Sequence, residues 1–149
     1  MLENVEATQN QGGTLSELTA PNNSLMVVVR NVDEKGRVLI PHAIREALGD
    51  EFVSYHGRKD TEILLYSSMT FSGVQERLIE SMGSLSGFES RIRERLFYSR
   101  VNECSFDSVG RFNLSSHHRS SETIPTKVEI TWDRVRDFVR VTFLGSLES

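Results

Sequence analysis

Residues 32–49 have the sequence VDEKGRVLIPHAIREALG, a polar turn followed by a short apolar run and a helix-like segment. The turn, residues 33–36, lies between two apolar segments, residues 25–32 and 37–40, and this pattern predicts two strands joined by a tight turn. Gly36 is expected to adopt the positive φ that such a turn requires. The stretch therefore predicts a strand, a turn and a second strand in direct succession.

A short helix and a hairpin are expected next. Pro41 favours the first position of a helix, and Gly49 favours the position just past its end. Residues 51–56 and 62–67 have the composition of strands, and the polar loop at 57–61 predicts that they form a hairpin. The first half of the chain is thus predicted to hold four strands and one helix.

The later part of the chain contains a second, less regular copy of the turn. Residues 106–119, FDSVGRFNLSSHHR, match residues 32–45 at a shift of 74 positions. A shift of 75 then aligns the apolar alternation of residues 53–66 with that of residues 128–141. The matched glycine and arginine positions are Gly36 with Gly110, Arg37 with Arg111, and Arg45 with Arg119. Agreement in both charged and apolar positions indicates an internal duplication.

Apolar residues recur at helical spacing between the two copies. This spacing predicts one helix over residues 70–82 and another over 88–99, with a glycine- and serine-containing connection between them. Neither copy buries two faces alone, so we expect the copies to pack together. The predicted fold class is α+β, with two strand-turn-strand-helix halves packed as a pseudo-dimer around a helical hairpin. The expected divisions are a disordered polar tail at 1–24, a first unit at 25–68, the helical hairpin at 69–100 and a second, degenerate unit at 101–149.

Composition argues against several classes of function. Cys104 is the only cysteine, which excludes an internal disulfide and a cysteine-based zinc site. His117 and His118 are adjacent and would point apart, with no Asp, Glu or Cys at ligand spacing, so no metal site is expected. No nucleophile has a convincing base, and no phosphate-binding glycine loop is present. We therefore expect no enzyme activity, no cofactor and no small-molecule substrate.

Charge and hydropathy bear on location and partners. Residues 1–24 have no basic start and no apolar run, so they do not resemble a signal peptide, and we expect a cytoplasmic protein without a membrane partner. The net charge is −4, and residues 25–149 contribute −1 because three glutamates lie before them. This balance argues against nonspecific nucleic-acid binding by the whole surface, but it permits local positive turns.

Each turn places an arginine next to a glycine, where a backbone can approach a ligand closely. Arginine makes bidentate hydrogen bonds to phosphate and to guanine, and Lys35 adds a point charge. One hypothesis is therefore a nucleic-acid contact surface, and the alternative is an ordinary solvated loop. Asp33 with Arg45, and Asp107 with Arg119, are also candidates for structural ion pairs that hold helix to turn. The residues alone leave these alternatives open.

The motif in residues 33–45, DEKGRVLIPHAIR, closely resembles the signature of the MraZ proteins, within the broader AbrB-like (SpoVT/AbrB) swapped-hairpin group. The copy in residues 107–119, DSVGRFNLSSHHR, stands where that family has its second signature. The helical hairpin between them also resembles the middle of the family. The resemblance extends over residues 26–143, which is most of the chain.

This resemblance implies a bacterial, cytoplasmic, nucleoid-associated transcription factor. It implies binding to repeated promoter boxes on double-stranded DNA upstream of the division and cell-wall gene cluster, and assembly into ring-shaped homo-oligomers. Carried over to this sequence, the predicted DNA-binding residues are Lys35, Gly36, Arg37, Arg45, Gly110, Arg111 and Arg119.

The second copy departs from the motif in ways that predict weaker DNA contact. Val109 replaces the motif lysine, and Ser115 replaces the motif proline. Two alternatives to a DNA-binding regulator remain. One is an AbrB-like antitoxin with a toxin protein as partner, although such antitoxins resemble a single motif followed by a tail. The other is a scaffold protein that has lost DNA binding and acts through protein contacts.

Overall fold

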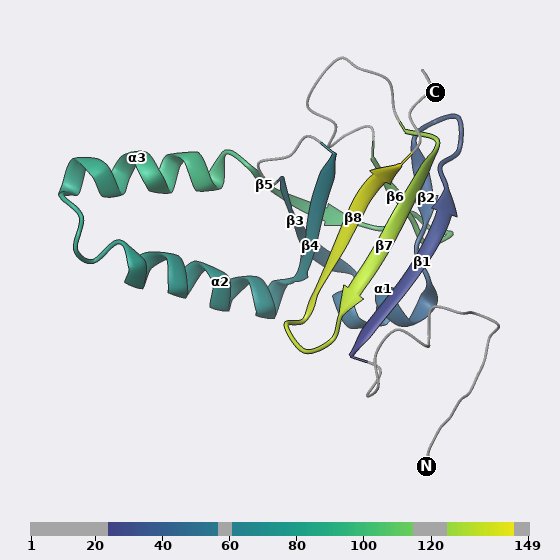
Figure 1. Ribbon diagram of the computed structural model, residues 1–149, viewed down its shortest axis with the longest axis horizontal. Helices are drawn as coiled ribbons and strands as arrows, with labels where there is room; N and C mark the ends of the chain where they lie inside the picture. The colour runs from purple at the N-terminus through teal and green to yellow at the C-terminus, as the bar shows by residue number, and fades with distance from the viewer. Residues whose placement is uncertain (1–23, 57–60, 115–124, 145–149) are drawn as a thin grey trace, which may run out of the picture.

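The computed structural model describes residues 24–56, 61–114 and 125–144, and it is an α+β fold with antiparallel strands and helices (Figure 1). The predicted polar tail, apart from Ser24, and the segment that contains Arg119 lie outside the described residues. The described elements are β1 (Leu25–Asn31), β2 (Arg37–Leu39), α1 (His42–Leu48), β3 (Glu51–His56), β4 (Glu62–Ser67), α2 (Ser68–Ser81), α3 (Gly87–Tyr98), β5 (Val101–Ser105), β6 (Arg111–Asn113), β7 (Lys127–Asp133) and β8 (Phe138–Leu144).

Six of these strands form one antiparallel sheet in the order β1-β7-β8-β4-β3-β5, and β2 pairs with β6 in a separate two-stranded ribbon. The first strand of each sequence copy pairs with the hairpin of the other copy, since β1 pairs with β7 and β5 pairs with β3. The counterparts in the two copies are β1 and β5, β3 and β7, and β4 and β8. Replacing each strand by its counterpart gives the same strand order, read from the opposite edge of the sheet. The duplication seen in the sequence is therefore matched by a duplication in the topology.

The β2–β6 ribbon, called the ribbon below, lies where the two copies cross. Val38 is paired with Phe112, its own counterpart in the other copy, and both side chains are buried. At each end of the ribbon the two copies are joined by matching backbone hydrogen bonds. The N–H of Leu114 donates to the carbonyl of Gly36 at 2.7 Å, and the N–H of Ile40 donates to the carbonyl of Gly110 at 3.2 Å.

The core lies between the ribbon, helix α1 and one face of the large sheet. Helix α1 begins after Pro41, the N-cap residue, and it buries Ile44 and Leu48 against the strands. Phe52 stacks on Phe106 with ring centroids 4.5 Å apart. The side chains that are buried most completely are Phe52, Phe112, Ile40, Ile44, Ile63, Leu65, Leu114, Ile130, Val38, Val128, Val139 and Val141. Both copies contribute to this single cluster, so neither forms its core alone.

Helices α2 and α3 form the predicted hairpin, which projects away from the sheet (Figure 1). The helices begin at residues 68 and 87, slightly earlier than predicted, because serine caps each start. Ser67 Oγ accepts from the N–H of Thr70, and Ser86 forms a capping box with Glu89. Neither these helices nor α1 is both long and apolar enough to cross a membrane.

The hairpin exposes most of its apolar side chains, although their helical spacing would normally indicate burial. In α3 no residue is buried, and in α2 only Phe71 is buried. Phe71 stacks on Phe97 with centroids 5.7 Å apart, which fixes the base of the hairpin. The large apolar residues of the hairpin that are at least 40% exposed are Met69, Ile79, Phe88, Ile92, Leu96 and Tyr98.

Candidate functional site

The ribbon has one buried face and one outward face. Because successive side chains on a strand point to opposite faces, burial of Val38 and Phe112 turns their neighbours outward. Arg37 is paired with Asn113, and Leu39 is paired with Arg111, so the two arginines lie at opposite ends of one diagonal of this face. The outward face therefore carries two arginines that occupy equivalent positions in the two copies.

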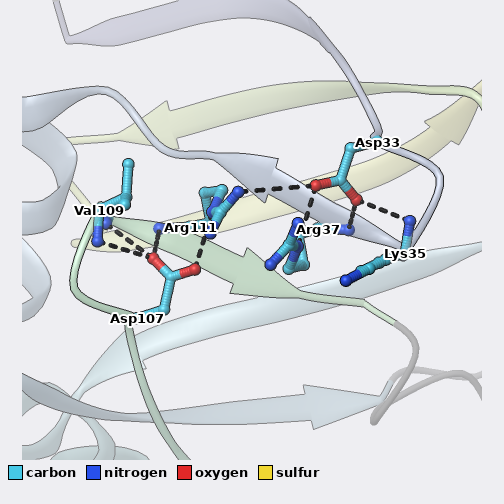
Figure 2. A network of polar contacts seen from close by, with 7 residues as sticks. Asp33, Lys35, Arg37, Asp107, Val109 and Arg111 are labelled. Atoms are coloured by element: carbon cyan, nitrogen blue, oxygen red, sulfur yellow. Dashed lines mark hydrogen bonds and ion pairs between the residues drawn. The ribbon is translucent and has the colours of Figure 1, made fainter.

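The first turn, residues 33–37, is held by Asp33. Its Oδ1 atom accepts from the N–H groups of Lys35 at 2.9 Å and Arg37 at 2.8 Å (Figure 2). The carbonyl of Asp33 also accepts from the N–H of Gly36, whose φ of 82° is open to glycine but unfavourable for other residues. Aspartate favours such turns because its short side chain reaches the backbone two residues onward.

The second turn, residues 107–111, repeats this geometry. Asp107 Oδ1 accepts from the N–H groups of Val109 at 3.0 Å, Gly110 at 2.9 Å and Arg111 at 2.8 Å. Gly110 has a φ of 100°. The departures of the second copy from the motif have therefore not changed the backbone of its turn.

The same two aspartates orient the two arginines. Arg37 Nε donates to Asp33 Oδ2 at 2.9 Å, and Arg111 Nε donates to Asp107 Oδ2 at 2.7 Å. Arg111 Nη1 lies 3.8 Å from Asp33 Oδ2, which links the two turns across the ribbon (Figure 2). Within the described residues, neither arginine makes a hydrogen bond through an Nη atom. Each guanidinium is thus oriented through Nε, and that of Arg111 also faces Asp33 through Nη1.

Hydrogen bonding lowers the pKa of both aspartates. The backbone N–H of Arg37 is the largest cause for Asp33, and the backbone N–H of Arg111 is the largest cause for Asp107. The arginine side chains add to this effect, and the pKa of Asp107 falls to about 2. Both carboxylates are therefore charged near neutral pH and hold the turns and arginines in place.

The pH dependence of stability is expected to reflect the lowered pKa of Asp107. A carboxyl group with a lowered folded-state pKa stabilises the fold above its unfolded pKa of about 3.9, and this contribution disappears as pH falls through the folded value. The stability difference between wild type and Asp107→Asn should therefore shrink between about pH 4 and about pH 2. Urea unfolding across this range measures it, with Asp50→Asn as the control. A difference that stays constant with pH would contradict the role of the Asp107 charge.

Arg45 has a different environment from the ribbon arginines. Its Nε donates to the carbonyl of Ile40 at 2.9 Å, and its guanidinium lies over Gly110 of the other copy. The predicted ion pair between Asp33 and Arg45 is wrong, because Asp33 is occupied by local bonds to Arg37 in its own turn. Arg45 thus holds helix α1 to the second turn.

Gly110→Ala is expected to destabilise the protein. A Cβ at Gly110 would clash with the guanidinium of Arg45, and the φ of 100° is strained for alanine. We expect a loss of at least about 1 kcal/mol in the free energy of unfolding, measured by urea titration. Gly73→Ala is the matched control, because its Cβ would meet only Arg77 Nη1 at 3.7 Å within a helix, and it should stabilise slightly. A neutral Gly110→Ala would contradict the packing of Arg45.

Five of the seven predicted site residues lie together in the two turns, namely Lys35, Gly36, Arg37, Gly110 and Arg111. Arg45 lies apart from them because its side chain packs between helix α1 and the second turn. Arg119, the partner predicted for Asp107, lies outside the described residues. Sequence reasoning missed that Asp33 and Asp107 orient the arginines. The available signal was the position of each aspartate, two residues before a backbone N–H that its side chain can cap.

The structure shows no metal centre among the residues it describes, where no group of three or more His, Cys, Asp or Glu side chains is arranged to hold an ion. An open hollow of about 750 Å³ lies between helix α1 and the second turn, and the residues that line it include Arg45, Glu46, Asp50 and Asp107. Its charges are of both signs, and it adjoins the ribbon without containing Arg37 or Arg111.

Several known proteins are similar to this chain. The transcriptional regulator MraZ of Desulforamulus reducens is 31% identical over 126 residues, which cover 76% of this chain and 87% of that protein. The transcriptional regulator MraZ of Halothermothrix orenii is 32% identical over 100 residues, which cover 67% of this chain and 68% of that protein. The protein of the same name from Limosilactobacillus fermentum is 38% identical over 88 residues, 58% of each chain. No protein-family model matches the chain.

Proposed function

The chain belongs to the MraZ family, and from this premise we propose that it is a sequence-specific DNA-binding regulator of transcription whose ribbon contacts DNA. The observation that carries the proposal is the pair of arginines on the outward face of the ribbon, each held through Nε by an aspartate. The major groove of DNA admits a two-stranded ribbon, and arginine bonds both guanine edges and phosphates. In this proposal Arg37 and Arg111 contact bases or phosphates, while Gly36 and Gly110 allow close approach of the backbone.

The finer target proposed here is the one that the motif resemblance implies. We propose that the DNA consists of repeated promoter boxes upstream of the division and cell-wall gene cluster, in the nucleoid of the cytoplasm. A single ribbon offers few contacts and would bind weakly. Repeated boxes bound by several linked ribbons raise the overall affinity through effective concentration. Oligomerisation is therefore part of the proposal.

We also propose that the two halves form an AbrB-like pseudo-dimer, with the units divided as the sequence suggested. One support is the strand order, which reads the same from the opposite edge when matched strands are exchanged. The other is the pairing of Val38 with its counterpart Phe112. Under this proposal the ribbon lies on the pseudo-two-fold axis. The two arginines then face DNA with the approximate symmetry of a dimer.

The surface proposed for self-association is the exposed apolar hairpin. Phe88, Ile92 and Leu96 are four residues apart and form one stripe on α3. Exposed apolar surface of this kind marks interaction sites. Helix α2 carries a net charge of −1 and α3 a net charge of +1, so the hairpin of a second copy is a complementary occupant. The proposed oligomer is therefore joined through α2 and α3.

The double variant Ile92→Gln, Leu96→Gln is expected to reduce the mass of the assembly to that of smaller species, because it removes apolar contact while keeping good helix formers. Light scattering after size-exclusion chromatography measures the mass, and circular dichroism checks that the helices persist. Val135→Gln, which changes an exposed valine between β7 and β8, is the control. An unchanged mass for the double variant would contradict the hairpin interface.

The test of the proposed function is fluorescence anisotropy on duplex DNA from upstream of the gene, beside unrelated duplex of equal length, over a salt series. We expect tighter binding to the upstream DNA and an affinity that falls steeply with salt, at a slope of about −0.9 per neutralised phosphate. Equal and salt-insensitive binding to both duplexes would overturn the proposal. The exposed hairpin favours one alternative, a scaffold acting through protein contacts, and assembly without DNA binding would support that alternative.

A further inference from the structure

Resting on the proposed function, we infer that the two turns of the ribbon contact DNA unequally, and that position 109 sets this difference. The first turn brings a lysine ammonium to a phosphate, whereas the second turn reaches an equivalent place on the DNA with an uncharged valine. Each chain therefore binds a DNA site whose two halves differ. Lys35 and Val109 occupy equivalent positions in the two turns.

The two positions are equivalent in every described backbone contact. The N–H of Lys35 donates to Asp33 Oδ1 at 2.9 Å, and the N–H of Val109 donates to Asp107 Oδ1 at 3.0 Å. Both side chains are exposed, and that of Val109 has 57% of its surface accessible. Each precedes a glycine with positive φ and an arginine held by its own aspartate. A side chain at either position therefore leaves the ribbon in the same direction relative to its turn.

The two turns differ in the charged groups at their tips, although the net charge of each turn is zero. In each turn the arginine and aspartate balance one another, as Arg37 does with Asp33 and Arg111 with Asp107. The first turn adds Glu34 and Lys35, and the ammonium of Lys35 has no partner within the part of the chain that the structure describes. The second turn has Ser108 and Val109 at these places and adds no charge. Lys35 is thus available to neutralise a phosphate, and its counterpart is not.

This asymmetry predicts a gain of function. Because the backbone of the second turn matches the first, Val109→Lys should place a new ammonium where the second turn meets DNA. Each added phosphate contact steepens the dependence of log affinity on log salt by about 0.9 per chain bound. Lys35→Val should flatten the slope by the same amount. The exchange variant Lys35→Val, Val109→Lys should return the slope of wild type.

The experiment measures these slopes by fluorescence anisotropy for the wild type and the three variants, using the full chain. Val135→Lys is the matched control, because it adds the same charge to an exposed valine at the end of the sheet where Leu25 pairs with Asp133. We expect Val109→Lys to steepen the slope and Val135→Lys to leave it unchanged. A Val109→Lys slope no steeper than that of Val135→Lys would overturn the inference.

The outcomes also separate the inference from the proposed function. If wild type binds DNA with a steep salt slope and Arg37→Ala weakens it, the proposed function stands whatever Val109→Lys does. If Val109→Lys then fails to steepen the slope, a side chain at position 109 does not reach a phosphate, and only the inference is lost. If wild type shows no salt-dependent binding, both are overturned.

Discussion

Arg37→Ala and Arg111→Ala are each expected to weaken binding to the upstream DNA by about 1–3 kcal/mol, roughly five- to more than a hundred-fold in Kd. The reason is that an aspartate holds each guanidinium through Nε in one orientation on the outward face of the ribbon. Losing either removes a preorganised bidentate donor from the centre of the ribbon. Anisotropy titrations at one fixed salt concentration measure the change.

Arg136→Ala is the matched control for both substitutions. It removes the same charge from an exposed arginine that pairs with Asp133 at 3.9 Å, in the turn between β7 and β8. Its effect on affinity should be small. If Arg37→Ala and Arg111→Ala changed affinity no more than Arg136→Ala, the ribbon would not be the DNA-contacting surface.

Phe112→Ala is expected to cause the largest loss of stability among the substitutions considered, about 3–5 kcal/mol. Phe112 is 1% exposed, pairs with Val38 at the crossing of the two copies, and lies 5.9 Å from the ring of Phe52. Its truncation leaves a cavity beneath the ribbon that the surrounding strands cannot fill. Urea unfolding monitored by circular dichroism measures the free energy.

Phe88→Ala makes the same truncation on an exposed residue of the hairpin. If the hairpin is an association surface, this variant should alter how the unfolding midpoint depends on protein concentration, with little effect in dilute protein. Loss of stability from Phe88→Ala equal to that from Phe112→Ala would show that the core is not centred on the ribbon.

Local structure could be predicted from the sequence because its signals are local. The strands at 51–56 and 62–67 have the predicted bounds, and the helical hairpin is confirmed with shifts of one or two residues. The positive φ of Gly36 is also confirmed. Each of these features depends on turn glycines, β-branched runs or helical spacing within a few neighbouring residues.

Pairing across the fold and the use of individual side chains could not be predicted. Periodicity shows that β1 is a strand, but it does not show that β1 pairs with β7 of the other copy. The helical spacing of Ile92 and Leu96 is the same for a buried face and for an exposed one. Arg45 stands at a motif position and was predicted to pair with Asp33. In the structure Asp33 instead bonds to Arg37 in its own turn, and Arg45 packs on Gly110. Such choices depend on distances that the sequence does not contain.

The most direct test of the ribbon as the DNA-contacting surface is hydroxyl-radical footprinting of the protein with and without the upstream duplex. Leu39 and Val109 are 46% and 57% exposed at the ribbon, and Val135 is 75% exposed at the far end of the sheet. We predict that DNA lowers the oxidation of Leu39 and Val109 while that of Val135 stays unchanged. Unchanged oxidation of Leu39 and Val109 at saturating DNA would contradict the assignment of the ribbon as the DNA-binding surface.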